Sequence, residues 1–126
     1  MSESAITVLY VDDEEELCNL FQMTFHSPEH NVRVFSDPSQ ALAFLEEHKV
    51  AIVFCDFRMP RMDAPEFYRQ MPERLKDRVP FYVVTGLTSA ASFEIPDNSG
   101  DFSGFYSKPL KSAEIKSLLN SGLADL

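Results

Sequence analysis

Residues 50–63 read VAIVFCDFRMPRMD, and this stretch decides the fold. It opens with an apolar run from Val50 to Cys55, rich in β-branched and aromatic residues, which is typical of a strand buried on both faces. The run ends at an acidic residue, Asp56, and a segment containing Pro60 follows. A strand buried on both faces needs a covering layer on each side, so the stretch predicts an α/β protein.

Two further runs of this kind lie on either side of it along the chain. Ile6–Val11 precedes it and Phe81–Val84 follows it, and both are short and almost wholly apolar. Weaker runs at Val32–Phe35 and Phe102–Tyr106 demand less burial, so we expect edge strands there.

Helical spacing replaces strand spacing between these runs. Pro38, preceded by Ser36 or Asp37 as the N-cap, marks one helix start, and another helix is expected to open after Ser112. A fourth helix is restricted to about Ser89–Phe93, because Pro96 and the segment 97–100 end it. The apolar stripes are Leu17, Leu20, Phe21 and Phe25; Pro38, Ala41, Leu42 and Leu45; Ala64, Phe67, Tyr68, Met71 and Leu75; and Ile115, Leu118, Leu119 and Leu123.

The alternation of strands and helices predicts a parallel sheet with helices on both faces. Right-handed crossovers leave few arrangements, and the simplest is a three-layer α/β/α fold with strand order 2-1-3-4-5. The chain has 126 residues, which fits one domain over residues 1–126.

Charge and hydropathy exclude some classes of function. The formal net charge is −9, and such a surface repels phosphate polyanions, so we expect no direct nucleic-acid binding. No apolar run approaches the ~20 residues of a membrane span, and the N-terminus lacks the basic segment of a signal peptide. We therefore expect a cytoplasmic protein without a membrane anchor. Cys18 and Cys55 lie in apolar patterns and are expected to be buried, reduced thiols.

Polar residues stand at the ends of four predicted strands. Asp12 and Asp13 follow the first strand, Asp56 the third, Thr85 the fourth and Lys108 the fifth. Ligands of an open parallel sheet bind beyond the carboxyl ends of its strands, near the point where strand order reverses. The first and third strands are neighbours at that point, so we expect three carboxylates to meet there.

Three carboxylates at close range repel one another unless a cation lies among them. Mg²⁺ and Mn²⁺ prefer carboxylate, water and phosphate oxygens, and Lys108 would add a compact positive charge from the other side. The chain has neither a His/Cys cluster for zinc nor a Gly-rich phosphate loop. The pattern therefore predicts a site for Mg²⁺ (or Mn²⁺).

Four markers, each at a strand end, carry a resemblance to a known family. They are Asp12-Asp13, then Asp56-Phe-Arg-Met-Pro-Arg-Met-Asp63, then Thr85-Gly86, and then Lys108-Pro109. In this order they resemble the receiver domains of two-component response regulators, over residues 6 to about 119. The resemblance implies a flavodoxin-like fold and a phosphorelay switch. It implies no enzyme beyond self-phosphorylation and autodephosphorylation.

The resemblance implies a role for each acidic residue of the site. Asp56 corresponds to the phospho-acceptor, which takes a phosphoryl group from a phosphohistidine. The metal ligands would be Asp13, Asp56 and the backbone carbonyl of Arg58, and Asp12 would contact the metal through a water molecule.

The same resemblance assigns the residues that respond to phosphorylation. Lys108 and Thr85 would bind phosphoryl oxygens, which supplies charge neutralisation that phosphoryl transfer needs. Phe105 would be the switch aromatic, turning inward when Thr85 moves toward the phosphate. Pro109 matches the family's cis-proline. Together these residues would form a two-state element biased by a local charge.

Three features depart from the family pattern. Ala64 replaces a common glycine, and because a left-handed backbone would cost alanine roughly 1 kcal/mol, we expect a helix start there. Arg58 and Glu14 flank the mouth of the site, where an ion pair would shield the phosphoryl group; two solvated side chains are an equal alternative. Together with Leu87, these two are expected to modulate dephosphorylation. The short fourth helix is the third departure.

The family implies a sensor histidine kinase or a phosphotransfer protein as the partner. The output partner, or a fused effector domain, is not named by the sequence, and a phosphorylation-dependent homodimer is a further option. We expect either a free-standing receiver or a piece of a larger regulator or hybrid kinase.

Other functions stay open at this point. A degenerate receiver would act as a phosphorylation-independent protein-binding module. A Mg²⁺-dependent phosphohydrolase of the aspartyl-phosphate type needs Asp-x-Asp after the first strand, where this chain has Asp12-Asp13-Glu14. A flavodoxin needs a Ser/Thr/Gly phosphate loop there, and none follows the first strand.

Overall fold

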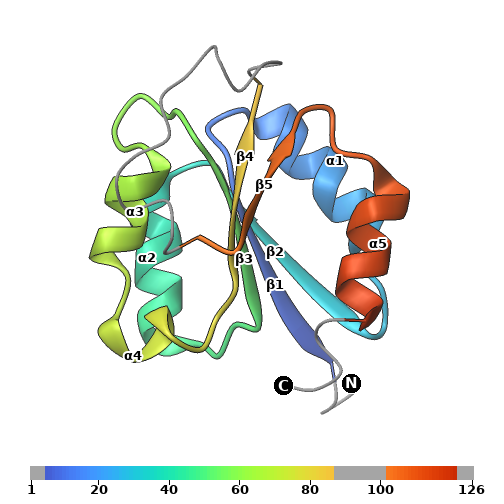
Figure 1. The fold of residues 1–126 in the computed structure, drawn as a ribbon, viewed down its shortest axis with the longest axis horizontal. Helices are drawn as coiled ribbons and strands as arrows, with labels where there is room; N and C mark the ends of the chain where they lie inside the picture. The colour runs from blue at the N-terminus through green and yellow to red at the C-terminus, as the bar shows by residue number, and fades with distance from the viewer. Residues whose placement is uncertain (1–4, 87–101, 122–126) are drawn as a thin grey trace.

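A computed structural model of the chain describes residues 5–86 and 102–121. One parallel sheet contains all five described strands, in the order β2-β1-β3-β4-β5 (Figure 1). The strands are β1 (Ile6–Val11), β2 (His30–Phe35), β3 (Ile52–Asp56), β4 (Phe81–Thr85) and β5 (Gly104–Ser107). The predicted strand order is therefore confirmed, with β2 and β5 as the edge strands.

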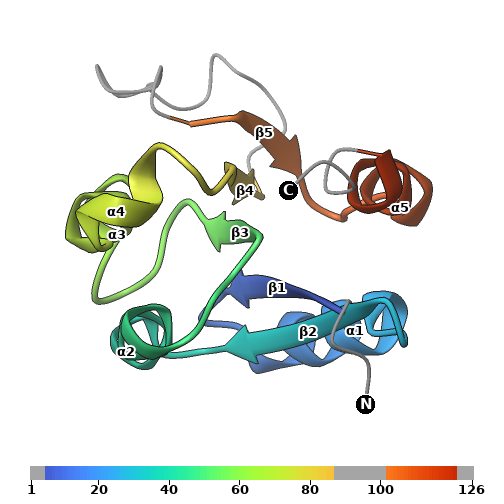
Figure 2. The ribbon, with the colours of Figure 1, turned by 90° about the horizontal axis from the view of Figure 1, so that it is seen from below.

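Helices cover both faces of this sheet, so the molecule has three layers (Figures 1 and 2). The described helices are α1 (Glu15–Phe25), α2 (Pro38–Glu47), α3 (Ala64–Gln70), α4 (Glu73–Lys76) and α5 (Ser112–Ser121). α1 and α5 pack on one face, whereas α2, α3 and α4 pack on the other. The short helix expected at Ser89–Phe93 lies outside the described residues. Within the described part, no helix has the length and apolar character to span a bilayer.

The central strands β1 and β3 are buried on both sides. Along β1, Leu9 and Val11 belong to the core under α2 and α3, and Val8 and Tyr10 belong to the core under α1 and α5. This alternation follows from the two-residue period of a strand. It places the residue after β1, Asp12, in line with Tyr10.

One helix stripe differs from the sequence-based prediction. Leu20 of α1 was expected in the core, but 58% of it is exposed. The buried residues of α1 are instead Cys18, Phe21 and Phe25. They lie at i, i+3 and i+7, which share one helix face, and Leu20 lies about 100° away from Phe21.

The third predicted stripe is divided between two helices. α3 ends at Gln70 and α4 begins at Glu73, because Pro72 disfavours helical backbone at Met71. The helix start expected at Ala64 is confirmed: Asp63 caps α3 by accepting a hydrogen bond from the backbone N–H of Glu66. No described non-glycine residue has a positive φ, so Ala64 carries no strain.

Candidate functional site

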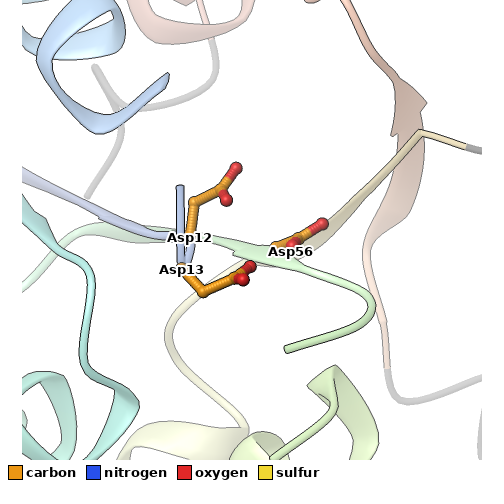
Figure 3. A group of neighbouring side chains, drawn as sticks. All are labelled: Asp12, Asp13 and Asp56. Carbon is orange, nitrogen blue, oxygen red and sulfur yellow. The ribbon is translucent and has the colours of Figure 1, made fainter. Parts of the chain in front are cut away.

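Three carboxylates meet at the carboxyl ends of β1 and β3. Asp12 and Asp13 follow β1, Asp56 ends β3, and one oxygen from each lies within 4.8 Å of the others (Figure 3). The parallel register that pairs Val11 with Cys55 places these strand ends side by side. The meeting of carboxylates expected from strand order is therefore observed.

Asp12 is fully buried and accepts bonds on both of its carboxylate oxygens. Its Oδ1 accepts from the backbone N–H of Glu14 at 2.9 Å. Its Oδ2 accepts from the Tyr10 hydroxyl at 2.8 Å and pairs with Lys108 Nζ at 2.9 Å. Three segments of the chain thus hold this carboxylate in one orientation.

Lys108 is the positive charge of the site. Its Nζ lies 2.9 Å from Asp12 Oδ2, 3.1 Å from Asp56 Oδ1 and 3.4 Å from Glu14 Oε1. Burial lowers the pKa of Lys108, but the carboxylates of Asp12 and Asp56 raise it by more, so the ammonium stays charged. Its backbone N–H donates to the Thr85 carbonyl, and the bond to Pro109 is cis, as predicted.

Asp56 is 6% exposed and has an unusual acidity. Burial, followed by repulsion from Asp12, raises the pKa of Asp56 to about 7 against the opposing pull of Lys108. Additional positive charge beside the Asp56 carboxyl would lower its pKa and favour the ionised carboxylate. The three carboxylates supply the oxygen ligands that a hard divalent cation prefers, and Asp13 is exposed on the solvent side. The donor set therefore fits Mg²⁺ or Mn²⁺.

Thr85 and Phe105 lie on the two strands beyond β3. Thr85 ends β4, is buried, and pairs in register with Ser107 of β5. Phe105 of β5 is half-buried against the core under α2 and α3, with its ring 5.9 Å from Phe102 in an edge-on contact. The structure therefore places Thr85 at the same end of the sheet as the carboxylates and Phe105 two positions before the end of β5.

Of the two alternatives for Arg58 and Glu14, the structure does not show the hypothesised ion pair between them. Glu14 pairs with Lys108, and the Arg58 guanidinium lies 5.9 Å from the centre of the Phe57 ring. Lys108 already occupies the centre of the acidic group, so it is the cation within reach of Glu14. Leu87, the third predicted modulator, lies outside the described residues.

Sequence reasoning assigned no role to Tyr10 or to Cys18. Both contact Asp12: the Tyr10 hydroxyl donates to its side chain, and the Cys18 thiol donates to its backbone carbonyl at 3.1 Å. Burial and the charge of Asp12 raise the pKa of Tyr10, so the hydroxyl stays protonated and remains a donor. The signal was the two-residue spacing from Tyr10 to Asp12, which puts both side chains on one face of the strand. Both cysteines are buried and unbridged, as predicted.

Sequence comparisons point to one family. The family model of the response regulator receiver domain matches residues 8–120. The hydrogenase transcriptional regulatory protein HoxA of Cupriavidus necator is 30% identical over 109 residues, which cover 86% of this chain and 22% of that protein. The transcriptional regulatory protein ZraR of Escherichia coli K12 is 26% identical over 98% of this chain and 28% of its own length. The chain thus spans about a quarter of the length of these relatives.

Solved structures agree with the family match. An uncharacterized protein of Neptuniibacter caesariensis superposes with a TM-score of 0.79 at 29% identity, covering 94% of this chain and 87% of that one. The chemotaxis response regulator CheY4 of Vibrio cholerae gives a TM-score of 0.75 over 92% of this chain and 97% of its own; at 23% identity it supports the fold alone. With the family model spanning nearly the whole chain, the protein belongs to the response regulator receiver domains of two-component signalling.

Proposed function

We propose that Asp56 accepts a phosphoryl group from the phosphohistidine of a sensor histidine kinase or a phosphotransfer protein. The observation that carries this proposal is the position of Lys108, whose Nζ bridges Asp12 and Asp56 where three carboxylates converge. A carboxylate held beside both a cation-binding group and an ammonium is equipped for phosphoryl transfer, which depends on positioning and charge neutralisation.

The transfer itself makes one bond and breaks one. A carboxylate oxygen of Asp56 bonds to phosphorus, the bond from phosphorus to the imidazole nitrogen breaks, and the electron pair stays on that nitrogen. Lys108 Nζ, now 3.1 Å from Asp56 Oδ1, needs only a small movement to bind a phosphoryl oxygen. Water attacking phosphorus later releases phosphate and restores the carboxylate.

A divalent cation, Mg²⁺ or Mn²⁺, would be held by Asp13, Asp56 and the backbone carbonyl of Arg58. Asp12, fixed by its own donors, would support it through a water molecule. When bound, the cation supplies positive charge between the acceptor carboxylate and the phosphoryl oxygens. Both oxygens of Asp12 already accept bonds from Glu14, Tyr10 and Lys108, whereas Asp13 is exposed, which supports this division of roles.

The conformational response would run through Thr85 and Phe105. The Thr85 hydroxyl would bind a phosphoryl oxygen, and the half-buried Phe105 would turn further into the space that Thr85 leaves. Such a pair has two arrangements, and the charge on Asp56 selects between them.

Three residues would modulate dephosphorylation: Glu14, Arg58 and Leu87. Glu14 competes for the Lys108 ammonium, because its Oε1 lies 3.4 Å from Nζ. Arg58 is exposed beside the acceptor, where it would affect the approach of water to the phosphoryl group.

The output of the switch would come from an effector that the site residues do not identify. Relatives of this chain are named as transcriptional regulators, and one, RpfG of Xanthomonas campestris, is named as a cyclic di-GMP phosphodiesterase response regulator. Because those outputs differ, we assign this chain the switch alone, acting in the cytoplasm on an attached effector, a separate partner or a second copy.

Acetyl phosphate tests the proposal without knowledge of the kinase. With Mg²⁺ present, intact mass spectrometry should show the gain of one phosphoryl group. The gain should disappear with EDTA and in Asp56→Asn, and it should persist in the control Asp77→Asn, which changes an exposed acid at the end of α4. Equal labelling of Asp56→Asn and the native protein would reject Asp56 as the acceptor. No labelling of the native protein would favour a phosphorylation-independent binding module.

A further inference from the structure

The buried hydroxyl of Tyr10 is a polar group of the core that the proposed transfer leaves unused. Tyr10 is 2% exposed, and its ring stacks on Phe21 of α1 with centroids 4.2 Å apart and planes 14° apart. β1 holds one side of the ring and α1 the other, so the ring has little freedom to move. Its hydroxyl donates to Asp12 Oδ2 at 2.8 Å.

The resting site shares that oxygen between two donors. Asp12 Oδ2 receives the Tyr10 hydroxyl and also faces Lys108 Nζ at 2.9 Å. The proposed transfer requires Lys108 to turn toward a phosphoryl oxygen on Asp56. Asp12 is fully buried, and a buried carboxylate that loses its cationic partner without other donors is strongly destabilised.

Two of Asp12's donors do not depend on Lys108. The backbone N–H of Glu14 holds Oδ1, and the Tyr10 hydroxyl holds Oδ2. With the hydroxyl present, each oxygen keeps one hydrogen bond after Lys108 has moved. Without it, Lys108 is the one partner of Oδ2 among the residues that the structure describes, and Asp12 competes harder with the phosphoryl group for the ammonium.

Resting on the proposed function, we propose that Tyr10 is a positioning residue of the acceptor site. Its hydroxyl fixes the orientation of Asp12 and remains the donor to Oδ2 when Lys108 turns to the phosphoryl group. Tyr10 contacts no reacting atom; it acts through Asp12 and Lys108. It should therefore affect recognition of the phosphoryl group more than recognition of the metal.

The test compares Tyr10→Phe with Tyr82→Phe. The control removes the same atom from a half-buried tyrosine of β4, on the same face of the sheet, whose ring stacks on Phe54 away from Asp12. Beryllofluoride serves as the phosphoryl mimic at saturating Mg²⁺, and Mg²⁺ affinity is measured separately by calorimetry. We expect Tyr10→Phe to weaken beryllofluoride binding about tenfold, with Mg²⁺ affinity changed less than about threefold. Tyr82→Phe should match the native protein in both.

The outcomes separate this inference from the proposed function. If the native protein binds beryllofluoride and Tyr10→Phe binds it equally well, the role of Tyr10 is rejected and the acceptor function stands. A parallel loss of Mg²⁺ and beryllofluoride binding would also reject it, since that indicates a general loss of site structure. If the native protein binds no beryllofluoride, both proposals fall together.

A second measurement needs no variant with altered packing. A buried, hydrogen-bonded hydroxyl proton exchanges slowly with water and is observable by proton NMR. We expect the Tyr10 hydroxyl resonance to persist after saturation with Mg²⁺ and beryllofluoride, at a shifted position. Its loss to fast exchange in the saturated protein would show that the bond to Asp12 breaks, which overturns the inference.

Discussion

The central strands β1 and β3 are more deeply buried than the edge strand β5. β3 is buried at every position and β1 at its last four, whereas β5 is half-buried or exposed throughout. The acidic residues extend from the ends of β1 and β3 (Figure 3). Phe105, the proposed switch aromatic, lies on β5, and Lys108 directly follows that strand. Under the proposed function, the carboxylates that must stay fixed are on the rigid strands, and two groups that would move, Lys108 and Phe105, are on or next to the looser strand, while Thr85 lies at the buried end of β4.

This difference in burial separates the residues proposed for phosphoryl transfer from those proposed for the conformational response. Asp12 and Asp56 keep their geometry because the strands beneath them are packed on two sides. Lys108 and Phe105 can shift at lower cost, since an edge strand has one hydrogen-bonded neighbour. A variant in the centre should therefore change stability most, and a variant at the edge should change the response.

Truncation of one aromatic residue on each strand should give the largest difference. Phe54 of β3 is fully buried, and we expect Phe54→Ala to lower the free energy of unfolding by about 3–5 kcal/mol. Phe105→Ala on β5 should lower it by only about 1–2 kcal/mol, because the ring is partly exposed already. Urea unfolding measures both. Equal losses would show that the edge is as tightly packed as the centre.

The acidity of Asp56 should make stability depend on pH. Its pKa of about 7 in the folded protein exceeds the unfolded value of about 3.9. The folded state then binds the proton more strongly, so this contribution to stability is present below about pH 4 and is lost as pH rises to about 7.

The comparison with Asp56→Asn isolates that contribution. In EDTA, the native protein should lose roughly 1–3 kcal/mol relative to Asp56→Asn between about pH 4 and pH 7.5. Urea unfolding at several pH values measures the difference. If the stability of the two proteins changed with pH in the same way, the pKa of Asp56 would be close to its ordinary value. Burial would then not disfavour the ionised carboxylate.

Two glycines, one on the edge strand β5 and one directly after β4, offer a smaller and well-controlled test. A Cβ added at Gly104 of β5 would lie 3.1 Å from the Tyr82 ring, whereas one added at Gly86 meets nothing within 4 Å. Neither glycine has a positive φ. We expect Gly104→Ala to destabilise by about 1 kcal/mol and Gly86→Ala to change thermal stability little. A larger loss of stability in Gly86→Ala than in Gly104→Ala would mean that the Tyr82 ring moves aside at little cost.

The exposed partner of Lys108 should matter least. The side chain of Glu14 is 61% exposed and its pair with Lys108 measures 3.4 Å, so solvent screens the interaction. Glu14→Gln should release the ammonium slightly and strengthen beryllofluoride binding by about twofold. Calorimetry at low and at high salt measures it. A weakened affinity would show that Glu14 helps to place Lys108 rather than compete for it.

Much of the site was predictable because the carboxyl ends of parallel strands all lie at the same end of the sheet. Each polar residue of the site stands at the end of an apolar run, and strand order alone brings them to the same end of the sheet. These residues are Asp12, Asp13, Asp56, Thr85 and Lys108. Strand order in turn follows from burial, since continuous apolar runs belong in the centre. No long-range side-chain detail was needed for either step.

The sequence left contacts open, or placed a residue wrongly, where side-chain reach or the rotation of a helix decides. The partner of Glu14 depends on which long cation reaches it, and spacing along the chain does not distinguish Lys108 from Arg58. Leu20 fits an apolar stripe by type, but its rotation on α1 exposes it. Tyr10 looks like any aromatic strand residue, and only the geometry shows that its hydroxyl meets Asp12.

The position of the phosphoryl group tests the central claim most directly. After treatment with acetyl phosphate and Mg²⁺, borohydride reduction converts an aspartyl phosphate to homoserine, and peptide mass spectrometry locates it. The account predicts homoserine at position 56 alone, with none in samples treated in EDTA. Homoserine at position 12 or 13 instead, or its absence from all three positions, would contradict the assignment of Asp56 as the acceptor.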